Sequence, residues 1–596
     1  MKRKLVTYFS FAPVLWSVVA FAGDPMKDAI AVLPGDTMVC LVIPSLKQLD
    51  ADYGAAVNDL GLQAQLPPPF NSLVGILKTF VPPFAGIDEN GSAALVILGA
   101  ESLDALQKQQ VMVLPSADPK GMIEKMGGQA GEGGVWSVNF FGQASFAVAG
   151  DKRVILAQSA DAAKKVNESK GFDAKIPAND LKSLEGLDIA FWVDAQRFFK
   201  LVKPQIDMFL PMMLMAQGPK QAEATKKQID MFIDGSSSFY FGISLGKPGL
   251  DIRAGLGTKA GTELAKRTKT KATTESLLKG LPGGKYMLTF GHTSDPAAAT
   301  ATVKDLDPYI GMVESIEGVA KEMVAELRGL IEQWAPLSSG GRGTVEVLSG
   351  AGDGVFGVSL VVDTSDSKKW LELTDKAIQM GKKIVTDLKA DSPGSEVKEI
   401  KQVVSAVSHT PDVEQIGGVK VGHLKLDLSK VEGVDKEDQE HLAKVVGKEG
   451  VLFRLAAADG NVVAITFGGG QNYMGRLLES IKKKETAMDG EAGIKKVSPH
   501  LPNERSMVLY LAADQFVAGF NKLMAAVEEE QLPVQFPAMD APLAFSATGG
   551  DGWSRVDIFF PTELLVAGKN ATMTMMGGGA PPPPGNAPVV PGSKGN

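Results

Sequence analysis

Apolar and polar residues alternate over many short stretches of the chain, which predicts β-strands with one buried face. Paired stretches of this kind cover 135–158, 343–363 and 451–467, and the last two turn at Asp-Gly, a typical hairpin signal. Other stretches repeat apolar residues every three to four positions, which predicts helices, the longest over 300–334. Hairpins interspersed with helices favour an α+β fold with largely antiparallel sheets and packed helices.

The predicted elements occur twice in the same order. The segment 33–46 (LPGDTMVCLVIPSL) is similar to 281–292 (LPGGKYMLTFGH), and the same shift in residue number superposes 112–126 on 360–374. A constant shift over two separate segments is hard to obtain by chance. Later segments correspond at a larger shift, as 188–198 does with 506–516.

These correspondences predict two tandem α+β copies, the first at 27–265 and the second at 276–570. A polar link, 266–276, joins them. The second copy is longer, and its extra residues fall near 383–440. The sequence leaves open whether the two copies share one continuous sheet.

The two ends of the chain carry segments that we expect to lie outside the folded copies. Basic residues at 2–4 precede a short apolar run at 5–19, and Ala20-Phe21-Ala22 supplies the small residues that signal peptidase recognises. We therefore expect 1–22 to be a signal peptide cleaved after Ala22, and the protein to reach the periplasm or the cell exterior. Residues 571–596 are rich in Gly and Pro, which predicts a disordered tail.

Composition narrows the possible functions. The chain of 596 residues is 44% hydrophobic with a net charge of −8, and no apolar run after the leader is long enough to span a membrane. The acidic balance argues against nucleic acid as a partner. A single cysteine, Cys40, excludes an internal disulfide, and five scattered histidines argue against a His-based metal site. We expect no metal and no cofactor.

Familiar catalytic motifs are absent from the sequence. It contains no Gly-x-Ser-x-Gly elbow, no His-Glu-x-x-His and no Cys/His pair. The nearest nucleotide motif, GLGTKA at 255–260, is interpreted as a structural turn because no second strand with an acidic residue follows it. A hydrolase with a carboxylate-based site is a third hypothesis, since 69 acidic residues cannot be sorted into a catalytic pair without geometry.

Two segments of the first copy, 66–84 and 200–218, are unusually apolar, and 226–234 follows the second. Methionines crowd the second, and their flexible side chains suit adaptable apolar contacts. A carrier of lipid or apolar peptide would show one connected cavity lined by both segments, whereas the alternative is a helical hairpin packed on the sheet. The candidate hydrophobic-ligand residues are Phe70, Leu77, Phe80, Phe84, Met208, Phe209, Met212, Met213, Met215, Met231 and Phe232.

The opening motif LPGDT, at Leu33–Thr37, resembles the repeated LPADT-like strand–helix units of an uncharacterised exported family of planctomycete-type bacteria. The second copy keeps Leu-Pro at 281 and 501 but loses Asp-Thr. The resemblance implies export and a repeat architecture, and no active site. The sequence thus favours an exported non-enzymatic protein with a binding or envelope-structural role. The alternative is a periplasmic carrier of a hydrophobic ligand that uses the Met-rich region.

Overall fold

The computed structural model describes residues 24–63, 66–80, 85–140, 142–215, 219–246, 248–295, 303, 310, 319–350, 352–387, 397–527 and 536–575. The predicted leader and almost all of the predicted tail lie outside these ranges. So does most of the first half of the helix expected at 300–334, whose described part is α15 (Lys321–Trp334).

The strands of the first half are β1 (Thr37–Ile43), β2 (Ala93–Leu98), β3 (Gln110–Pro115), β4 (Gln129–Ala130), β5 (Val135–Phe140), β6 (Gln143–Gly150), β7 (Arg153–Ala157), β8 (Ile189–Asp194), β9 (Ser236–Gly246) and β10 (Gly249–Thr258). Those of the second half are β11 (Tyr286–Thr293), β12 (Ser338–Gly350), β13 (Gly354–Thr364), β14 (Val407–Ile416), β15 (Val419–Leu426), β16 (Val451–Asp459), β17 (Val462–Phe467), β18 (Met507–Leu511), β19 (Leu543–Gly550) and β20 (Trp553–Pro561).

The helices of the first half are α3 (Pro25–Ala31), α4 (Leu46–Asp59), α5 (Leu73–Phe80), α6 (Leu103–Lys108), α7 (Pro119–Lys125), α8 (Ala160–Glu168), α9 (Ala178–Leu184), α10 (Ala195–Leu214), α11 (Pro219–Gly235) and α12 (Glu263–Thr268). After α15, those of the second half are α16 (Ser367–Asp387), α17 (Val397–Ala406), α18 (Lys436–Val446), α19 (Gly470–Lys483), α20 (Ala492–Val497), α21 (Ala513–Ala526) and α22 (Thr562–Met575).

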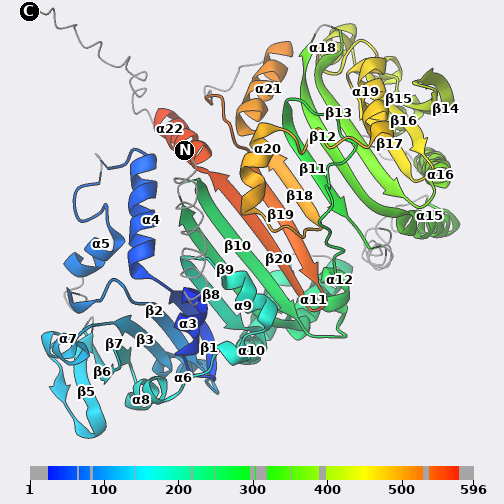
Figure 1. The fold of residues 1–596 in the computed structure, drawn as a ribbon. Coiled ribbons are helices and arrows are strands. Elements are labelled where there is room, and N and C mark those ends of the chain that lie inside the picture. The colour runs from blue at the N-terminus through cyan, green and yellow to red at the C-terminus, as the bar shows by residue number, and fades with distance from the viewer. Residues whose placement is uncertain are drawn as a thin grey trace, which may run out of the picture.

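All the named strands belong to one antiparallel sheet (Figure 1). Hydrogen-bonded neighbours run β5-β6-β7-β3-β2-β1-β8-β9-β10 in the first half and β20-β19-β18-β11-β12-β13-β17-β16-β15 in the second, with β4 and β14 at the two ends. Read outward from the central pair, the two halves have the same strand order. The predicted α+β class with largely antiparallel pairing is confirmed.

Strands β10 and β20 form the seam between the halves. They pair antiparallel from Gly249 opposite Pro561 to Gly257 opposite Trp553, without a bulge. Figure 1 shows them side by side at the centre, with the β1 to β9 strands on one side and the β11 to β19 strands on the other. The question that the sequence left open is thereby answered, because the two halves share one continuous sheet.

Helices on one face of this sheet build the main core, and α7 and α21 pack on parts of the opposite face. In the first half Cys40 and Trp192 pack with Ala163 of α8, and in the second Val361 packs with Met474 of α19. Burial raises the pKa of the Cys40 thiol to about 12, so this cysteine stays protonated and acts as a small hydrophobe.

The GLGTKA motif is not a turn. Gly255 and Gly257 lie inside strand β10, and a Cβ on Gly255 would fall 1.9 Å from the Tyr240 ring. The glycine is therefore needed for the close approach of an aromatic ring from the neighbouring strand. Among the described residues, no helix is both long enough and apolar enough to cross a membrane.

Candidate functional site

Helices α10 and α11 form a hairpin inserted between the neighbouring strands β8 and β9. Asp194, the last residue of β8, caps α10 by accepting a hydrogen bond from the Arg197 backbone N–H at 3.1 Å. Aromatic rings anchor the base of the hairpin. Phe232 of α11 stacks on Phe239 of β9 at 5.5 Å, and Phe199 of α10 meets Phe239 edge-on at 5.6 Å.

The far end of the hairpin, in contrast, presents apolar side chains to solvent. Met208 is 63% exposed, Phe209 49%, Met212 60% and Met215 80%. We call these four side chains the hairpin tip. Residues 208–215 contain no polar side chain, so this part of α10 is apolar on all sides rather than on one stripe. Exposed apolar side chains gathered in this way mark an interaction site more often than isolated ones do.

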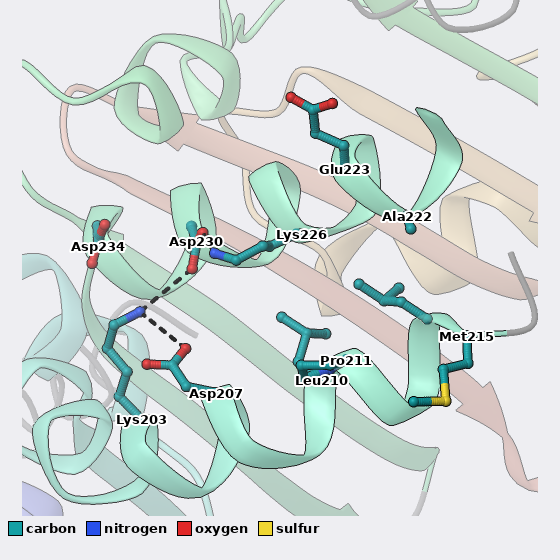
Figure 2. A pocket seen from close by; sticks show the side chains of 11 residues that line it. Lys203, Asp207, Leu210, Pro211, Met215, Ala222, Glu223, Lys226, Asp230 and Asp234 are labelled. Carbon is teal, nitrogen blue, oxygen red and sulfur yellow. Dashed lines mark hydrogen bonds and ion pairs between the residues drawn. The ribbon is translucent and has the colours of Figure 1, made fainter. Parts of the chain in front are cut away.

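A groove of about 690 Å³ runs between the two helices (Figure 2). Its apolar wall comprises Leu210, Pro211, Leu214, Met215 and Ala222, and Leu210 is almost fully buried there. The remaining lining residues are charged and are Lys203, Asp207, Glu223, Lys226, Asp230 and Asp234.

Ion pairs cross the groove at its charged end. The Lys203 ammonium lies 3.4 Å from an Asp230 carboxylate oxygen and 3.6 Å from one of Asp207, and Lys226 also donates to Asp230. The hydrogen bond from Lys226, followed by that from Lys203, holds the pKa of Asp230 below its usual value. Desolvation opposes the charge on Lys203, but Asp230 and its acidic neighbours raise the pKa of Lys203 overall. Both lysines are therefore paired with carboxylates, and the Lys203–Asp230 pair ties the two helices together.

The sheet face opposite the main core carries a second apolar surface, which reaches the hairpin base. Leu41 of β1 lies between Leu95 of β2 and Phe191 of β8, and Phe191 pairs with Phe241 of β9. Leu95 is 43% exposed, Phe191 36% and Phe241 45%. We call Leu41, Leu95, Phe191 and Phe241 the open row.

A second row lies on the same face, two residues further along each strand. Ile189, Ile243, Ile252 and Ile558 follow one another in register across β8, β9, β10 and β20. All four are only partly buried. Alternate residues of a strand share a face, so the two rows form one apolar surface.

Helices stand at both ends of these strands. At one end of β1, Val39 packs with Phe198 of α10, and at the other end Ile43 packs in a cluster that contains Leu46 of α4. Leu41 lies midway between them. We call the surface formed by the two rows between α10 and α4 the trough.

The structure separates the two segments that the sequence joined in one candidate site. Phe70 is exposed beside α4, where its carbonyl accepts a hydrogen bond from Tyr53, and Leu77 packs near Ile43 on the opposite side of the trough from α10. Met208, Phe209, Met212, Met215, Met231 and Phe232 all lie on the hairpin. Phe84 and the side chains of Phe80 and Met213 lie outside the described part of the structure. The groove is lined by α10 and α11 alone.

The open row was not among the sequence candidates, although its signal is present. In β8 (IAFWVD) and β9 (SSSFYFGISLG) the aromatic and aliphatic residues do not alternate with polar ones. Such runs predict strands buried on both faces. On the face opposite the main core, however, Leu95, Phe191 and Phe241 are each at least 36% exposed, so here the second set of apolar residues marks a surface.

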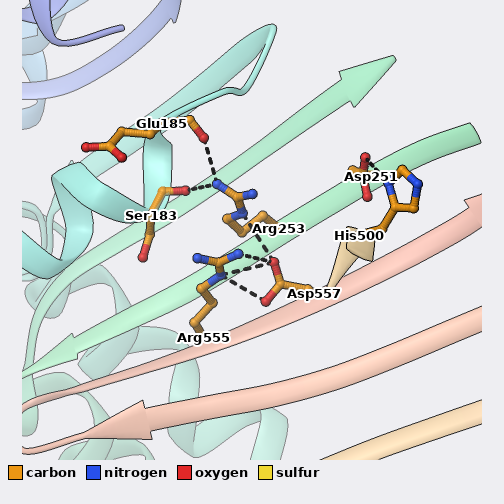
Figure 3. Close-up of polar contacts among 7 residues, drawn as sticks. All are labelled: Ser183, Glu185, Asp251, Arg253, His500, Arg555 and Asp557. Carbon is orange, nitrogen blue, oxygen red and sulfur yellow. Dashed lines mark hydrogen bonds and ion pairs between the residues drawn. The ribbon is translucent and has the colours of Figure 1, made fainter. Parts of the chain in front are cut away.

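Polar clusters elsewhere use their groups to hold strands together. At the seam, Asp557 accepts hydrogen bonds from Arg253 at 3.2 Å and from Arg555 at 2.8 Å, and Arg253 also donates to the Glu185 carbonyl (Figure 3). Nearby, His500 lies 3.5 Å from Asp251. Within the described ranges, no group of three or more His, Cys, Asp or Glu side chains is placed to hold a metal.

Comparison with known proteins adds little to this picture. No family model matches the chain, and no curated protein does. Among solved structures, crystal form III of TP0453 aligns at 11% identity over 50% of this chain and 98% of its own, with a TM-score of 0.21. Crystal form I of the same protein aligns at 12% identity over 51% and 99%, with a TM-score of 0.19. Likeness at this level carries no functional argument.

Proposed function

We propose that this is an exported, non-enzymatic binding protein that attaches to lipid surfaces through the hairpin tip. One observation carries the proposal, namely the exposure of four large apolar side chains at the far end of the α10–α11 hairpin. Transfer of such side chains into hydrocarbon is favourable by about 25 cal/mol per Å² of apolar area. Flexible Met side chains adapt to a fluid surface as well as to a shaped one.

The charges near the tip favour a lipid surface without a preferred headgroup charge. Lys203 and Lys226 are already paired with Asp207 and Asp230. No free cluster of basic residues lines the groove, so attraction to anionic lipid should contribute little. Binding should therefore proceed on neutral vesicles and change little with salt, which distinguishes it from the adsorption of a basic amphipathic helix.

The buried carboxylates of the protein give less support to an enzymatic role. The buried carboxylates at the seam and under α9 accept hydrogen bonds from Arg, Ser or Trp side chains of the protein itself. Asp180, for example, accepts from the Trp192 indole at 3.0 Å and also from Ser238. A carboxylate held in this way has a structural role that explains its burial.

The proposal is tested by flotation of the protein with phosphatidylcholine vesicles. The protein is produced with its leader in an exporting bacterial host, and mass spectrometry establishes whether it begins at Gly23. The triple variant Met208→Ser, Met212→Ser, Met215→Ser should bind at least tenfold more weakly, because each buried Met contributes about 1.5–3 kcal/mol. The matched control is Ile400→Ser, Val403→Ser, Val413→Ser, which removes three exposed apolar side chains of the second half. It should float like the wild type.

Two outcomes overturn the proposal. One is a wild-type protein that stays at the bottom of the gradient with neutral vesicles. The other is equal loss of flotation in the tip variant and in the control. All the substituted side chains are exposed, so the free energy of unfolding should change by less than about 0.5 kcal/mol per site, and misfolding should not confuse the result.

A further inference from the structure

We infer that the groove between α10 and α11 holds one lipid whose headgroup ends in an ammonium group. The inference rests on the proposed function, because the lipid surface at the hairpin tip would supply this lipid. The tip itself carries no charge and places no demand on the headgroup, whereas the groove has a charged end and an apolar end. The tip and the groove can therefore be tested separately.

The groove is a hollow whose size suits a small ligand. Its volume of about 690 Å³ falls within the range of about 300–1,000 Å³ that is usual for ligand pockets. Its apolar lining comprises Leu210, which is 4% exposed, Pro211, Leu214, Met215 and Ala222. None of these side chains can form a hydrogen bond of the usual strength, so this part of the groove suits a hydrocarbon chain.

Polar and apolar lining residues are separated along the hairpin. Figure 2 shows Lys203, Asp230 and Asp234 together at one end of the groove, and Met215 with Ala222 at the other. The apolar end includes Met215, so it adjoins the hairpin tip. A hairpin inserted by its tip therefore carries the apolar end of the groove into hydrocarbon and leaves the charged end at the level of the headgroups.

The length of the apolar part matches one acyl chain. Met215 lies eight positions after Asp207, which corresponds to about 12 Å along a helix at roughly 1.5 Å per residue. A bilayer has about 30 Å of hydrocarbon in two leaflets, so one leaflet contributes about 15 Å. A lipid in the groove therefore keeps the orientation that it has in the membrane, with its headgroup at the charged end.

The charges of the lining favour a cationic headgroup. Two lysines and four carboxylates line the groove, and both lysines are already paired with aspartates. The other two carboxylates, those of Glu223 and Asp234, form no ion pair with any residue that the structure describes. Asp234 lies at the charged end beside Lys203 (Figure 2). An ammonium group there would balance its charge, whereas an anionic headgroup would meet an excess of negative charge.

A helical peptide would fit the groove poorly. The Lys203 ammonium lies 3.4 Å from an Asp230 carboxylate oxygen, so side chains of α10 and α11 meet across the charged end. A third helix, about 10–12 Å in diameter with its side chains, would have to break this contact and separate the two helices. An acyl chain is much narrower, because it is a single row of methylene groups.

The test measures the binding of lysolipids below their micelle concentration to the exported protein, by isothermal titration calorimetry without vesicles. Lysophosphatidylethanolamine and lysophosphatidylglycerol with the same acyl chain are the matched probes. Both carry the tail and the phosphate, and only the first ends in an ammonium group. The wild type should bind the ethanolamine lipid saturably at one site, at least threefold more tightly than the glycerol lipid.

Three variants locate the binding. Asp234→Lys should reverse the preference between the two lipids, because the charged end would then hold three lysines and two aspartates. Ala222→Trp fills the apolar end and should weaken the binding of both lipids at least tenfold. The control Glu437→Lys reverses the charge of an exposed residue of α18 in the second half, and it should bind both lipids like the wild type.

The outcomes separate this inference from the proposed function. The double variant Met208→Ser, Met212→Ser alters tip residues that do not line the groove, so it should lose flotation but keep lysolipid binding. Ala222→Trp should do the reverse. The inference is overturned if the wild type binds neither lipid saturably, if it binds both equally well, or if Asp234→Lys binds like Glu437→Lys. Displacement of the lipid by an equal concentration of a cationic amphipathic helical peptide would assign the groove to a peptide and would also overturn it.

Discussion

Strand β8 of the first half and strand β18 of the second occupy the same place in the strand order, and each leads directly into a helix. Helix α10 after β8 has 20 residues, and α21 after β18 has 14. Three large apolar side chains of α10 and its C-cap Met215 are exposed, whereas in α21 the one large apolar side chain that is exposed is Phe516. The same position in the fold thus carries an open apolar helix in one half and a covered one in the other.

Contact with the sheet accounts for the difference. Gly519 brings α21 close to β11 and β12, because a Cβ at this position would lie 2.8 Å from both Met287 Sδ and Val347 Cγ2. Helix α10 packs on the sheet only near its start, through residues such as Phe198, and then continues beside α11. One helix is therefore used to build a core, and its counterpart is left to make a surface.

The two halves share one continuous sheet, and the variant Asp557→Asn, for which we expect the largest effect on stability, tests whether they unfold as one body. Asp557 is almost fully buried and pairs with Arg253 and Arg555 (Figure 3). Removal of the charge leaves two largely buried guanidinium groups without their carboxylate, and such a change costs about 3 kcal/mol or more. Urea unfolding followed by circular dichroism measures the loss.

The control for this variant is Asp551→Asn in the turn between β19 and β20, where the Asp551 side chain is 86% exposed and pairs with Lys269. It should change the free energy of unfolding by less than about 1 kcal/mol. If Asp557→Asn were as mild as its control, the seam would not hold the halves together. Two separate unfolding transitions in the wild type would contradict the single body directly.

Much of the fold could be predicted from local patterns. The Asp-Gly turns at 353–354 and 459–460 do join hairpins, and the alternating stretches around them are β12 to β13 and β16 to β17. The fold class follows from such elements. The β10–β20 seam could not be predicted, because its residues are about 300 positions apart and neither strand carries a local signal for its partner.

The candidate site could be predicted only in part. The Met-rich run 208–215 marked the hairpin, because an uninterrupted apolar stretch is visible in the sequence. Its grouping with 66–84 relied on composition, and composition does not specify which core cluster a segment joins. Phe191 and Phe241 were missed because the sequence of a strand does not show whether a helix covers the face on which an apolar residue lies.

A smaller effect on stability should distinguish the closely packed helix α21 from α22, where one glycine has free space around it. Inside a helix, alanine is more favourable than glycine by about 1 kcal/mol. Gly568→Ala in α22 should stabilise the protein by about this amount, since nothing lies within 4 Å of the added Cβ. Gly519→Ala should lose the gain or destabilise by about 1 kcal/mol, because Met287 and Val347 must move. Equal melting temperatures for the two variants would mean that α21 is not closely packed.

The smallest effect on stability concerns Asp180, a buried residue of α9, and it depends on pH. Burial raises the pKa of Asp180, although hydrogen bonds from Ser238 and Trp192 oppose the shift. A raised folded-state pKa means that the folded protein holds this proton more tightly than the unfolded chain does. The stabilisation is therefore complete below the unfolded pKa, near 3.9, and is lost as the pH rises through the folded value. The variant Asp180→Asn cannot titrate, so the free energy of unfolding of the wild type relative to the variant should increase as the pH is lowered from 7 to 4. Exposed Asp551→Asn should show no such trend. If the stability of the wild type relative to Asp180→Asn instead decreased on acidification, the hydrogen bonds from Ser238 and Trp192 would stabilise the Asp180 carboxylate. Burial would then not be the main influence on the pKa of Asp180.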